Sequence, residues 1–416
     1  MTQIIVPVFV IVYVGMFLGW LPRIQLDRTG VALLGAIALV ATRAVTIDSA
    51  GRAIDEETIA LLFAFMVISA QLRLGGFYTR VIQRVTALPV SERSLLGIVI
   101  CATAVLAAVF TNDVVCLAAT PVLIQACDRR GLDPVPFLLA LACAANIGSA
   151  WTLIGNPQNI LIGESLDLSF GGYSLLATVP VIAGLAVVWL VIVPQYRSRW
   201  TRSDTDRRLS EAPRPTVRLP AWNPWQATKG ITVTALLFLA FLVAPWPRAA
   251  LALGGAALLL TSRRFHSRDM LGLVDWQLLV LFAGLFVVNH ALQATGIPER
   301  LVAEVASRGL DLTHPAALFA QTVVLSNAVS NVPAVMLLLP LADHPLAGPL
   351  LAVVSTFAGN LLIVGSIANI IVVDIAAAHG IVIDWRTHAR TGAVVAGITL
   401  VVAGAAFWIV ARASGL

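Results

Sequence analysis

Charged residues are scarce in this sequence. They make up 12% of its 416 residues, hydrophobic residues make up 59%, and the mean hydropathy is +0.90. A soluble chain of this length needs a larger charged surface to stay dispersed in water. The composition therefore predicts an integral membrane protein, and the length suits about ten membrane spans at ~20 residues each.

Lysine and cysteine are also rare. Lys229 is the only lysine, and the arginines lie in short loops between apolar runs, where positive charge orients a protein in a membrane and does not indicate nucleic-acid binding. The four cysteines lack the CxxC spacing of metal or redox sites. Motifs of metalloproteases, serine hydrolases and P-loop ATPases are absent as well. We therefore expect a protein that is not an enzyme, with no cofactor and no metal ion other than sodium.

One long hydrophilic stretch divides the apolar runs into two sets. We expect a first transmembrane repeat over residues 1–196, a cytoplasmic linker over 197–229 and a second transmembrane repeat over 230–416. The predicted spans of the first repeat are Ile4–Trp20, Val31–Ala41, Ile59–Leu72 and Leu175–Val193. Those of the second are Ile231–Val243, Ala249–Leu260, Leu278–Val288 and Ala393–Val410.

Two pairs of apolar runs are short for spans and meet at polar residues. The first pair, Leu95–Phe110 and Val114–Ile124, meets at 111–113, and the second, Ala316–Leu325 and Val332–Leu341, meets at 326–331. Each pair predicts a re-entrant hairpin, whose tip lies inside the membrane.

Two more apolar segments contain residues that interrupt helices. Pro136–Leu161 includes Gly155, Pro157 and several amides, and Leu351–Ala377 includes Gly365 and Ser366. Unpaired backbone polar groups cost several kcal/mol each in lipid, so a broken helix survives only inside protein or beside a water-filled cavity. Each segment therefore predicts a broken transmembrane helix at a binding site.

The two halves share landmarks in the same order, which indicates an internal repeat. A shift of 219 residues carries Leu62-Phe63-Ala64 to Leu281-Phe282-Ala283, Asn112 to Asn331 and Pro121 to Pro340, and it sets Glu56 against Asp275. A shift of 210 carries Gly155 to Gly365 and Asn159 to Asn369.

Arginine placement predicts how the repeats lie in the membrane. The linker is the most basic loop, so we expect it in the cytoplasm and both termini outside. The first hairpin then enters from the cytoplasm and the second from outside. The expected fold is an all-α polytopic membrane protein of two inverted-topology repeats, each with a re-entrant hairpin and a broken helix, with about ten spans in all.

Polar residues at the hairpin tips and helix breaks are the candidate site. Amide and hydroxyl oxygens can coordinate a cation, and backbone N–H groups at half-helix starts can face an anion. The same residues could instead cap short helices or join helices by hydrogen bonds. The candidate substrate-binding residues are Thr111, Asn112, Asn156, Gln158, Asn159, Ser330, Asn331, Ser366 and Asn369. The candidate coupling-ion residues are Asp113, Asn146, Ser149, Thr152, Gly155, Asn327 and Gly365.

Asp113 is the one acid in an otherwise neutral apolar stretch. A carboxylate inside a membrane is costly and usually serves as a proton relay, an ion ligand or one member of an ion pair. Burial favours the neutral form of a carboxyl group, which would let Asp113 carry a proton. It could also act only as a cap on the returning arm. Asp374 and the histidines His290, His344, His379 and His388 are expected near the membrane surfaces.

The sequence resembles the ion transporter superfamily over nearly its whole length. The matching stretches are FTNDVVCLAATPVLI, NIGSAWTLIGNPQNILIG, SNAVSNVPAVMLLLP and VGSIANIIV. That group includes the arsenite permease ArsB, citrate-transporter-like proteins and divalent-anion/sodium symporters, and the sequence looks closest to the YbiR-type putative anion transporters. In symporters of the group, Ser-Asn-Thr motifs at the tips bind substrate carboxylate and sodium. Here Thr111-Asn112-Asp113 and Ser330-Asn331-Val332 stand at those positions, which suits proton coupling or a less charged substrate better.

The expected function is secondary active transport of a small anion or oxyanion by alternating access. The coupling ion is a proton or sodium, and the expected location is the bacterial inner membrane. The alternatives are an arsenite-type efflux permease and, from another class, a passive anion channel. Besides the anionic substrate and the lipid bilayer, the only partner that the resemblance suggests is a second copy in a homodimer.

Overall fold

The chain forms helices throughout the part that the structure describes. The computed structural model describes residues 1–19, 26–197, 199–201, 220–308 and 311–415, and these contain no strand longer than one bridged pair. The first half contains α1 (Thr2–Leu18), α2 (Arg28–Ala41), α3 (Ile47–Ala53), α4 (Glu56–Leu74), α5 (Phe77–Thr86), α6 (Glu92–Val109), α7 (Asn112–Arg130), α8 (Pro134–Ser149), α9 (Pro157–Ser165) and α10 (Phe170–Gln195).

The second half repeats this series in the same order. It contains α12 (Pro224–Val243), α13 (Arg248–Leu260), α14 (Ser267–Leu271), α15 (Trp276–Gln293), α16 (Ile297–Ser307), α17 (Pro315–Val329), α18 (Asn331–Leu338), α19 (Ala347–Ala358), α20 (Ile367–Ala378) and α21 (Trp385–Ser414), with the short 3-10 helices η1 (Leu339–Leu341) and η2 (Ile363–Gly365). Each of α1–α10 has a counterpart in α12–α21. The predicted all-α fold of two repeats is therefore confirmed.

Helix caps give the register of the two repeats. Asp55 caps α4 by accepting from the backbone N–H of Thr58, and Asp275 caps α15 in the same way, 220 residues later. Gly76 and Gly296, also 220 apart, precede α5 and α16 with φ values of 71° and 68°, which glycine adopts at little cost. The acid equivalent to Asp275 as a cap is thus Asp55, one residue before the expected Glu56.

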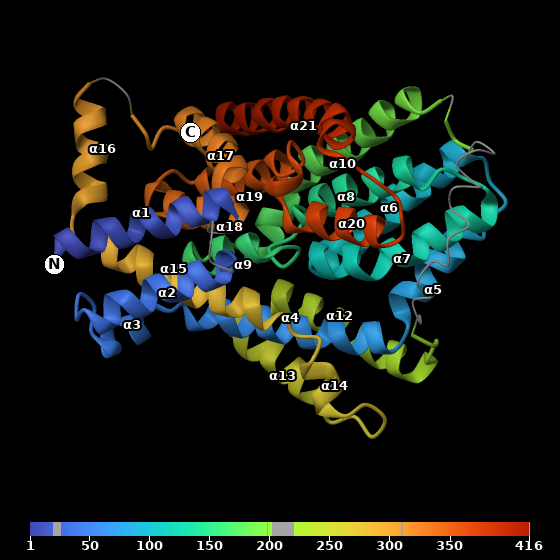
Figure 1. The fold of residues 1–416 in the computed structure, drawn as a ribbon, viewed down its shortest axis with the longest axis horizontal. Coiled ribbons are helices and arrows are strands. Elements are labelled where there is room, and N and C mark those ends of the chain that lie inside the picture. The colour runs from blue at the N-terminus through green and yellow to red at the C-terminus, as the bar shows by residue number, and fades with distance from the viewer. Residues whose placement is uncertain (20–25, 198, 202–219, 309–310, 416) are drawn as a thin grey trace.

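The two hairpins enter from opposite ends of the molecule. Arg130, at the base of hairpin α6–α7, lies near the loop after α5, and Leu132 pairs with Thr201 near the start of the linker. Pro315, at the base of hairpin α17–α18, lies instead beside Trp408 and Arg412 near the C-terminus. Both termini lie at the left in Figure 1, and the residues flanking the linker lie at the right. The repeats therefore have inverted topology.

Some predicted lengths were wrong. The arms of the first hairpin are 18 and 19 residues long, as long as spans, because α7 continues through Pro121 to the charged residues at its base. The arms of the second are 15 and 8 residues long, so α18 is too short to span the membrane, as predicted. Most of the predicted linker, 202–219, lies outside the described residues, and α12 begins within it at Pro224. The short helices α3, α5, α14 and α16 were not predicted.

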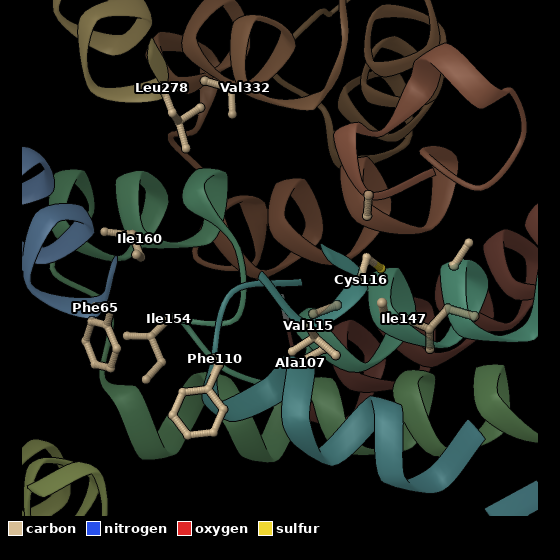
Figure 2. Packing of buried hydrophobic residues seen from close by; sticks show 14 of the residues in the cluster. Phe65, Ala107, Phe110, Val115, Cys116, Ile147, Ile154, Ile160, Leu278 and Val332 are labelled. Carbon is tan, nitrogen blue, oxygen red and sulfur yellow. The ribbon is translucent and has the colours of Figure 1, made fainter. Parts of the chain in front are cut away.

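One apolar core joins the two repeats. Figure 2 shows Val115 beside Ala107 within the first hairpin, and Leu278 of α15 beside Val332 of α18. Two groups of helices share this core. The outer group pairs α2 with α15 and α4 with α13, and the inner group holds both hairpins, both broken helices, α10 and α21. The inner group positions the polar residues.

Close packing in the inner group predicts a stability difference between two glycines. A methyl group at Gly148 of α8 would overlap the backbone of Ala104 in α6, whereas one at Gly397 of α21 would meet nothing within 4 Å. We expect Gly148→Ala to destabilise the protein by about 1–3 kcal/mol through overpacking. Gly397→Ala, the matched control, should stabilise it slightly, because alanine restricts the unfolded chain. The check is Tm in detergent, and equal Tm values for the two variants would contradict the packing.

Candidate functional site

Four helices begin around one small cavity. Its volume is about 20 Å³, and it lies between the two hairpin tips and the two helix breaks. Every lining residue is the cap, first or second residue of α7, α9, α18 or α20. The lining residues are Asn112, Asp113, Pro157, Gln158, Ser330, Asn331, Val332, Ser366 and Ile367. In this conformation the space suits one water molecule or one small ion.

The helix starts make this cavity electrostatically unusual. Each α-helix carries about half a positive charge at its N-terminus, where the first N–H groups lack partners within the helix. Four such ends face the cavity, and among the described residues no lysine, arginine or histidine lines it. Asp113 is the only ionisable residue that the described part of the chain places in the lining. The arrangement can bind an anion, with Asp113 as a repelling charge when it is ionised.

The break between α8 and α9 follows from its local sequence. A side chain at Gly155 would overlap the carbonyl group of Ser149, so the tight turn requires glycine there. Pro157 starts α9, where its missing N–H costs nothing. Asn156 caps the helix by accepting from the backbone N–H of Asn159 at 2.9 Å. These residue types therefore stop one helix and start another within seven residues.

Two asparagines hold the two breaks in the same way. Asn159 donates through Nδ2 to the carbonyl groups of the residues ten and seven positions earlier, at 3.4 and 3.0 Å. Asn369 donates to carbonyl groups ten and seven positions earlier at 2.8 and 3.1 Å. Both asparagines are fully buried and contact no cavity surface. They satisfy backbone carbonyls that a broken helix leaves unpaired.

Asn146 connects the first hairpin to both broken helices. Its Oδ1 accepts from Asn112 Nδ2 at 3.1 Å and from Ser366 Oγ at 2.9 Å. Its Nδ2 donates to Asn360 Oδ1 at 2.9 Å and to Asn369 Oδ1 at 3.0 Å. All four capacities of this amide are used, so Asn146 positions cavity residues from behind.

Gln158 makes the equivalent connection to the second hairpin. Its Nε2 lies 3.3 Å from Thr356 Oγ1 and 3.3 Å from the amide oxygen of Asn331. When the Asn331 amide is oriented so that its oxygen accepts from Gln158, its nitrogen donates to the carbonyl groups of Ser355 at 3.0 Å and Gly365 at 3.1 Å. Each tip asparagine thus also bonds to the break of its own repeat, since the backbone N–H of Asn112 donates to the Gly155 carbonyl at 3.1 Å.

The two tips differ in backbone conformation. Ser330 caps α18 with φ 75°, a value that a residue with a side chain rarely adopts, whereas Thr111 caps α7 with an ordinary φ of −61°. Such residues cost about 1–3 kcal/mol and cluster at ligand sites and moving segments. The second tip therefore stores strain that the first does not.

The structure sorts the predicted site residues into two groups. Six line the cavity, namely Asn112, Asp113, Gln158, Ser330, Asn331 and Ser366. Ten lie behind it, namely Thr111, Asn146, Ser149, Thr152, Asn156, Asn159, Gly155, Asn327, Gly365 and Asn369. Within the second group, Thr152 bonds to the carbonyl of Ala108 at 2.5 Å, which ties the first break to hairpin α6–α7. The Oδ1 of Asn327 has no hydrogen-bond partner.

Sequence reasoning missed several supporting residues. Thr356, Asn360 and Tyr173 bond to predicted site residues, and each is buried. His388 was expected near the membrane surface, but it is buried and its Nε2 lies 3.1 Å from the carbonyl of Asn360. A signal existed for Asn360, because it opens the polar second break, but nothing in the sequence indicated the others.

Solved structures and known proteins resemble this chain over most of its length. A crystal structure of the YdaH transporter from Alcanivorax borkumensis matches with TM-score 0.59 and 14% identity, covering 98% of this chain and 97% of that one. The inner membrane protein YbiR of Escherichia coli is 30% identical over 342 residues, covering 81% of this chain and 83% of YbiR. The silicon efflux transporter LSI3 of Oryza sativa subsp. japonica is 29% identical, with 85% of this chain and 86% of LSI3 covered.

A family model also matches residues 11–358 of this chain, a range that contains both hairpin tips and the first helix break. That model describes the citrate transporters. The chain is therefore a multi-pass membrane transporter, and it belongs to the citrate transporter family, CitMHS.

Proposed function

We propose that this protein is a secondary active transporter that moves a small anion together with a proton. The observation that carries the proposal is the meeting of four helix N-termini and one half-buried carboxyl group at a single cavity. The helix ends favour a negative ligand. The carboxyl group gives the cavity a proton-dependent charge.

The coupling follows from electrostatic repulsion inside the cavity. An ionised Asp113 opposes an anion, and a protonated one does not. Thermodynamic linkage makes this effect reciprocal, so the bound anion favours protonation by the same factor as the proton favours the anion. The loaded state then carries both, which is the requirement for coupled transport. Sodium is the other candidate coupling ion, with the unpaired Oδ1 of Asn327 as an available ligand.

The lining also limits the class of substrate. Amides and hydroxyls surround the cavity without any basic side chain, and the space is small. This favours an oxyanion of low charge with oxygens to accept and donate hydrogen bonds. The second candidate is efflux of a weakly acidic oxyacid in its uncharged form, which the absence of basic residues from this lining favours. The rice relative is named a silicon efflux transporter, and such a substrate would be of this kind.

Differences between the repeats support alternating access. Glu164 of α9 forms a half-buried ion pair with Arg248 of α13 at 2.9 Å. The equivalents in the other repeat are Asp374 and Arg28, by the shifts of 210 and 220. Asp374 is exposed, and Arg28 donates to the carbonyl of Met16. In a conformation where the repeats exchange arrangements, Arg28 would pair with Asp374 and the present pair would separate. Independently of this exchange, the arginines at the linker end favour an orientation in which that end faces the cytoplasm.

The coupling role predicts the effect of Asp113→Asn. Anion affinity of the wild type should fall about 5- to 150-fold as pH rises and Asp113 ionises. The variant should keep the low-pH affinity at every pH, because its side chain stays neutral. The measurement is Tm between pH 5 and 8 with phosphate, sulfate, citrate or arsenite, followed by uptake of the stabilising anion into proteoliposomes under a proton or a sodium gradient.

Asp48→Asn is the matched control, since Asp48 is an exposed acid paired with Arg52. It should behave as the wild type does. If Asp113→Asn still accumulated the anion in response to a proton gradient, Asp113 would not be the coupling residue. Accumulation driven only by a sodium gradient would identify sodium, and not the proton, as the coupling ion. Transport that never raises the internal anion concentration above its equilibrium value would indicate a passive channel.

The exchange of ion pairs predicts two cross-links in a variant without its native cysteines. Glu164→Cys with Arg248→Cys should react with a short bis-maleimide in this conformation. Arg28→Cys with Asp374→Cys should also react, although those side chains form no ion pair here, because the second conformation brings them together. Either cross-link should stop transport. The control pair, Arg28→Cys with Glu164→Cys, should not react, and an unreactive Arg28/Asp374 pair in an actively transporting protein would refute the exchange.

A further inference from the structure

A second pocket, remote from the central cavity, lies between α5 and the C-terminal end of α7. Its volume is about 660 Å³. Four arginines line it, two from each helix, and none of the described residues that line it is an aspartate or glutamate. The lining residues are Arg80, Gln83, Arg84, Thr86, Ala87, Leu88, Pro89, Val122, Gln125, Ala126, Arg129 and Arg130.

One of the four arginines builds the wall of the pocket. Arg130 donates to the carbonyl groups of Thr86 at 3.0 Å, Leu88 at 3.1 Å and Val90 at 2.9 Å. These bonds hold the loop after α5 against α7. Arg80, Arg84 and Arg129 form no ion pair within the described part of the chain and are exposed. Their guanidinium groups are therefore available to a ligand.

Membrane orientation alone does not account for this arrangement. Positive charge at the linker end orients the protein wherever it is placed in the loops. Here it is gathered around one concave site, where like charges raise each other's energy unless an anion neutralises them. A guanidinium group offers a planar fork of N–H donors that matches phosphate oxygens in pairs. Buried Val122 forms an apolar part of the same wall.

We propose that this pocket binds a phosphate-bearing anion, either the headgroup of an anionic phospholipid or a free phosphate compound. Arg80, Arg84 and Arg129 would hold the phosphate, and Gln83 and Gln125 would add neutral hydrogen bonds. The ligand bridges two helices, so its binding energy holds them together.

The bridge acts on the hairpin whose tip carries Asn112 and Asp113. Helix α5 packs against both arms, α6 and α7. Its counterpart α16 has no comparable contact with α17 or α18 within the described residues and packs on α15. A ligand between α5 and α7 therefore stabilises the present arrangement of the first hairpin, and it has no equivalent in the second. This makes the pocket a regulatory site, whether or not the transported substrate is the one proposed above.

The repeat supplies a matched control. Arg300 of α16 stands 220 residues after Arg80, and Glu304 stands 220 after Arg84, where the charge is reversed and pairs with Arg308. The second repeat thus has an equivalent of Arg80, one of the four pocket arginines, at a place where there is no such pocket among the described residues. Arg300→Gln removes the same charge from an equivalent helix.

The test uses the full-length protein in nanodiscs and has two arms. In one, nanodiscs of phosphatidylcholine receive increasing inorganic pyrophosphate. In the other, phosphatidylglycerol replaces part of the phosphatidylcholine. We expect Tm to rise in at least one arm for the wild type and for Arg300→Gln. The triple variant Arg80→Gln/Arg84→Gln/Arg129→Gln should bind at least about tenfold more weakly, since hydrogen bonds to charged groups are lost.

Ala126→Phe is a second variant, which fills part of the pocket with an aromatic ring and keeps every charge. It should also prevent the rise in Tm, which separates a bound ligand from a general effect of surface charge. A response to phosphatidylglycerol alone identifies a lipid headgroup, and a response to pyrophosphate identifies a soluble ligand. No rise in either arm, or an equal rise in the triple and filled variants, overturns the proposal.

Discussion

The structure depends on satisfying broken backbone inside a membrane. Two helices stop and restart at the depth of the hairpin tips, and each stop leaves carbonyl groups that lipid cannot hydrate. Asn159 and Asn369 each donate hydrogen bonds to two of these carbonyl groups, at the same spacing in the sequence. Asn146 connects both breaks to the first tip by hydrogen bonds. Once those groups are paired, the four helix starts can face one another inside the protein. The site is thus a product of the same bonds that make the fold tolerable.

Two opposed electrostatic effects meet in the cavity. The helix ends are fixed partial charges that no change of pH removes, whereas the charge on Asp113 depends on a proton. A cavity with only helix ends would hold an anion at any pH, and one with several carboxylates would exclude it. One carboxyl group among four helix ends lies between these limits.

Much of the fold could be predicted because polar residues in apolar segments are conspicuous. Asn112 and Asn331 were expected at the tips and Gly155 and Gly365 at the breaks, where the structure has them, and the repeat followed from their spacing. The second tip was expected too early, because α17 continues as helix to Val329. The direction in which each polar side chain points could not be predicted. Sequence shows that Asn159 is polar, but only packing shows that its amide faces backbone carbonyls and not the cavity. Helices α5 and α16 were missed because they are short and carry too much charge to resemble spans. The pair Glu164–Arg248 was missed because its partners come from different repeats.

The cavity draws two helix starts from each half of the chain, so neither half forms this cavity alone. The halves also stand upside down relative to each other. A half-length ancestor could therefore have worked only as a pair of copies inserted in opposite orientations, which requires a membrane segment with no strong preference for either. A single chain that contains both halves does not have that requirement. Each half was then free to acquire its own arginines and its own contacts, and the differences between α5 and α16 became a property that a single chain can inherit.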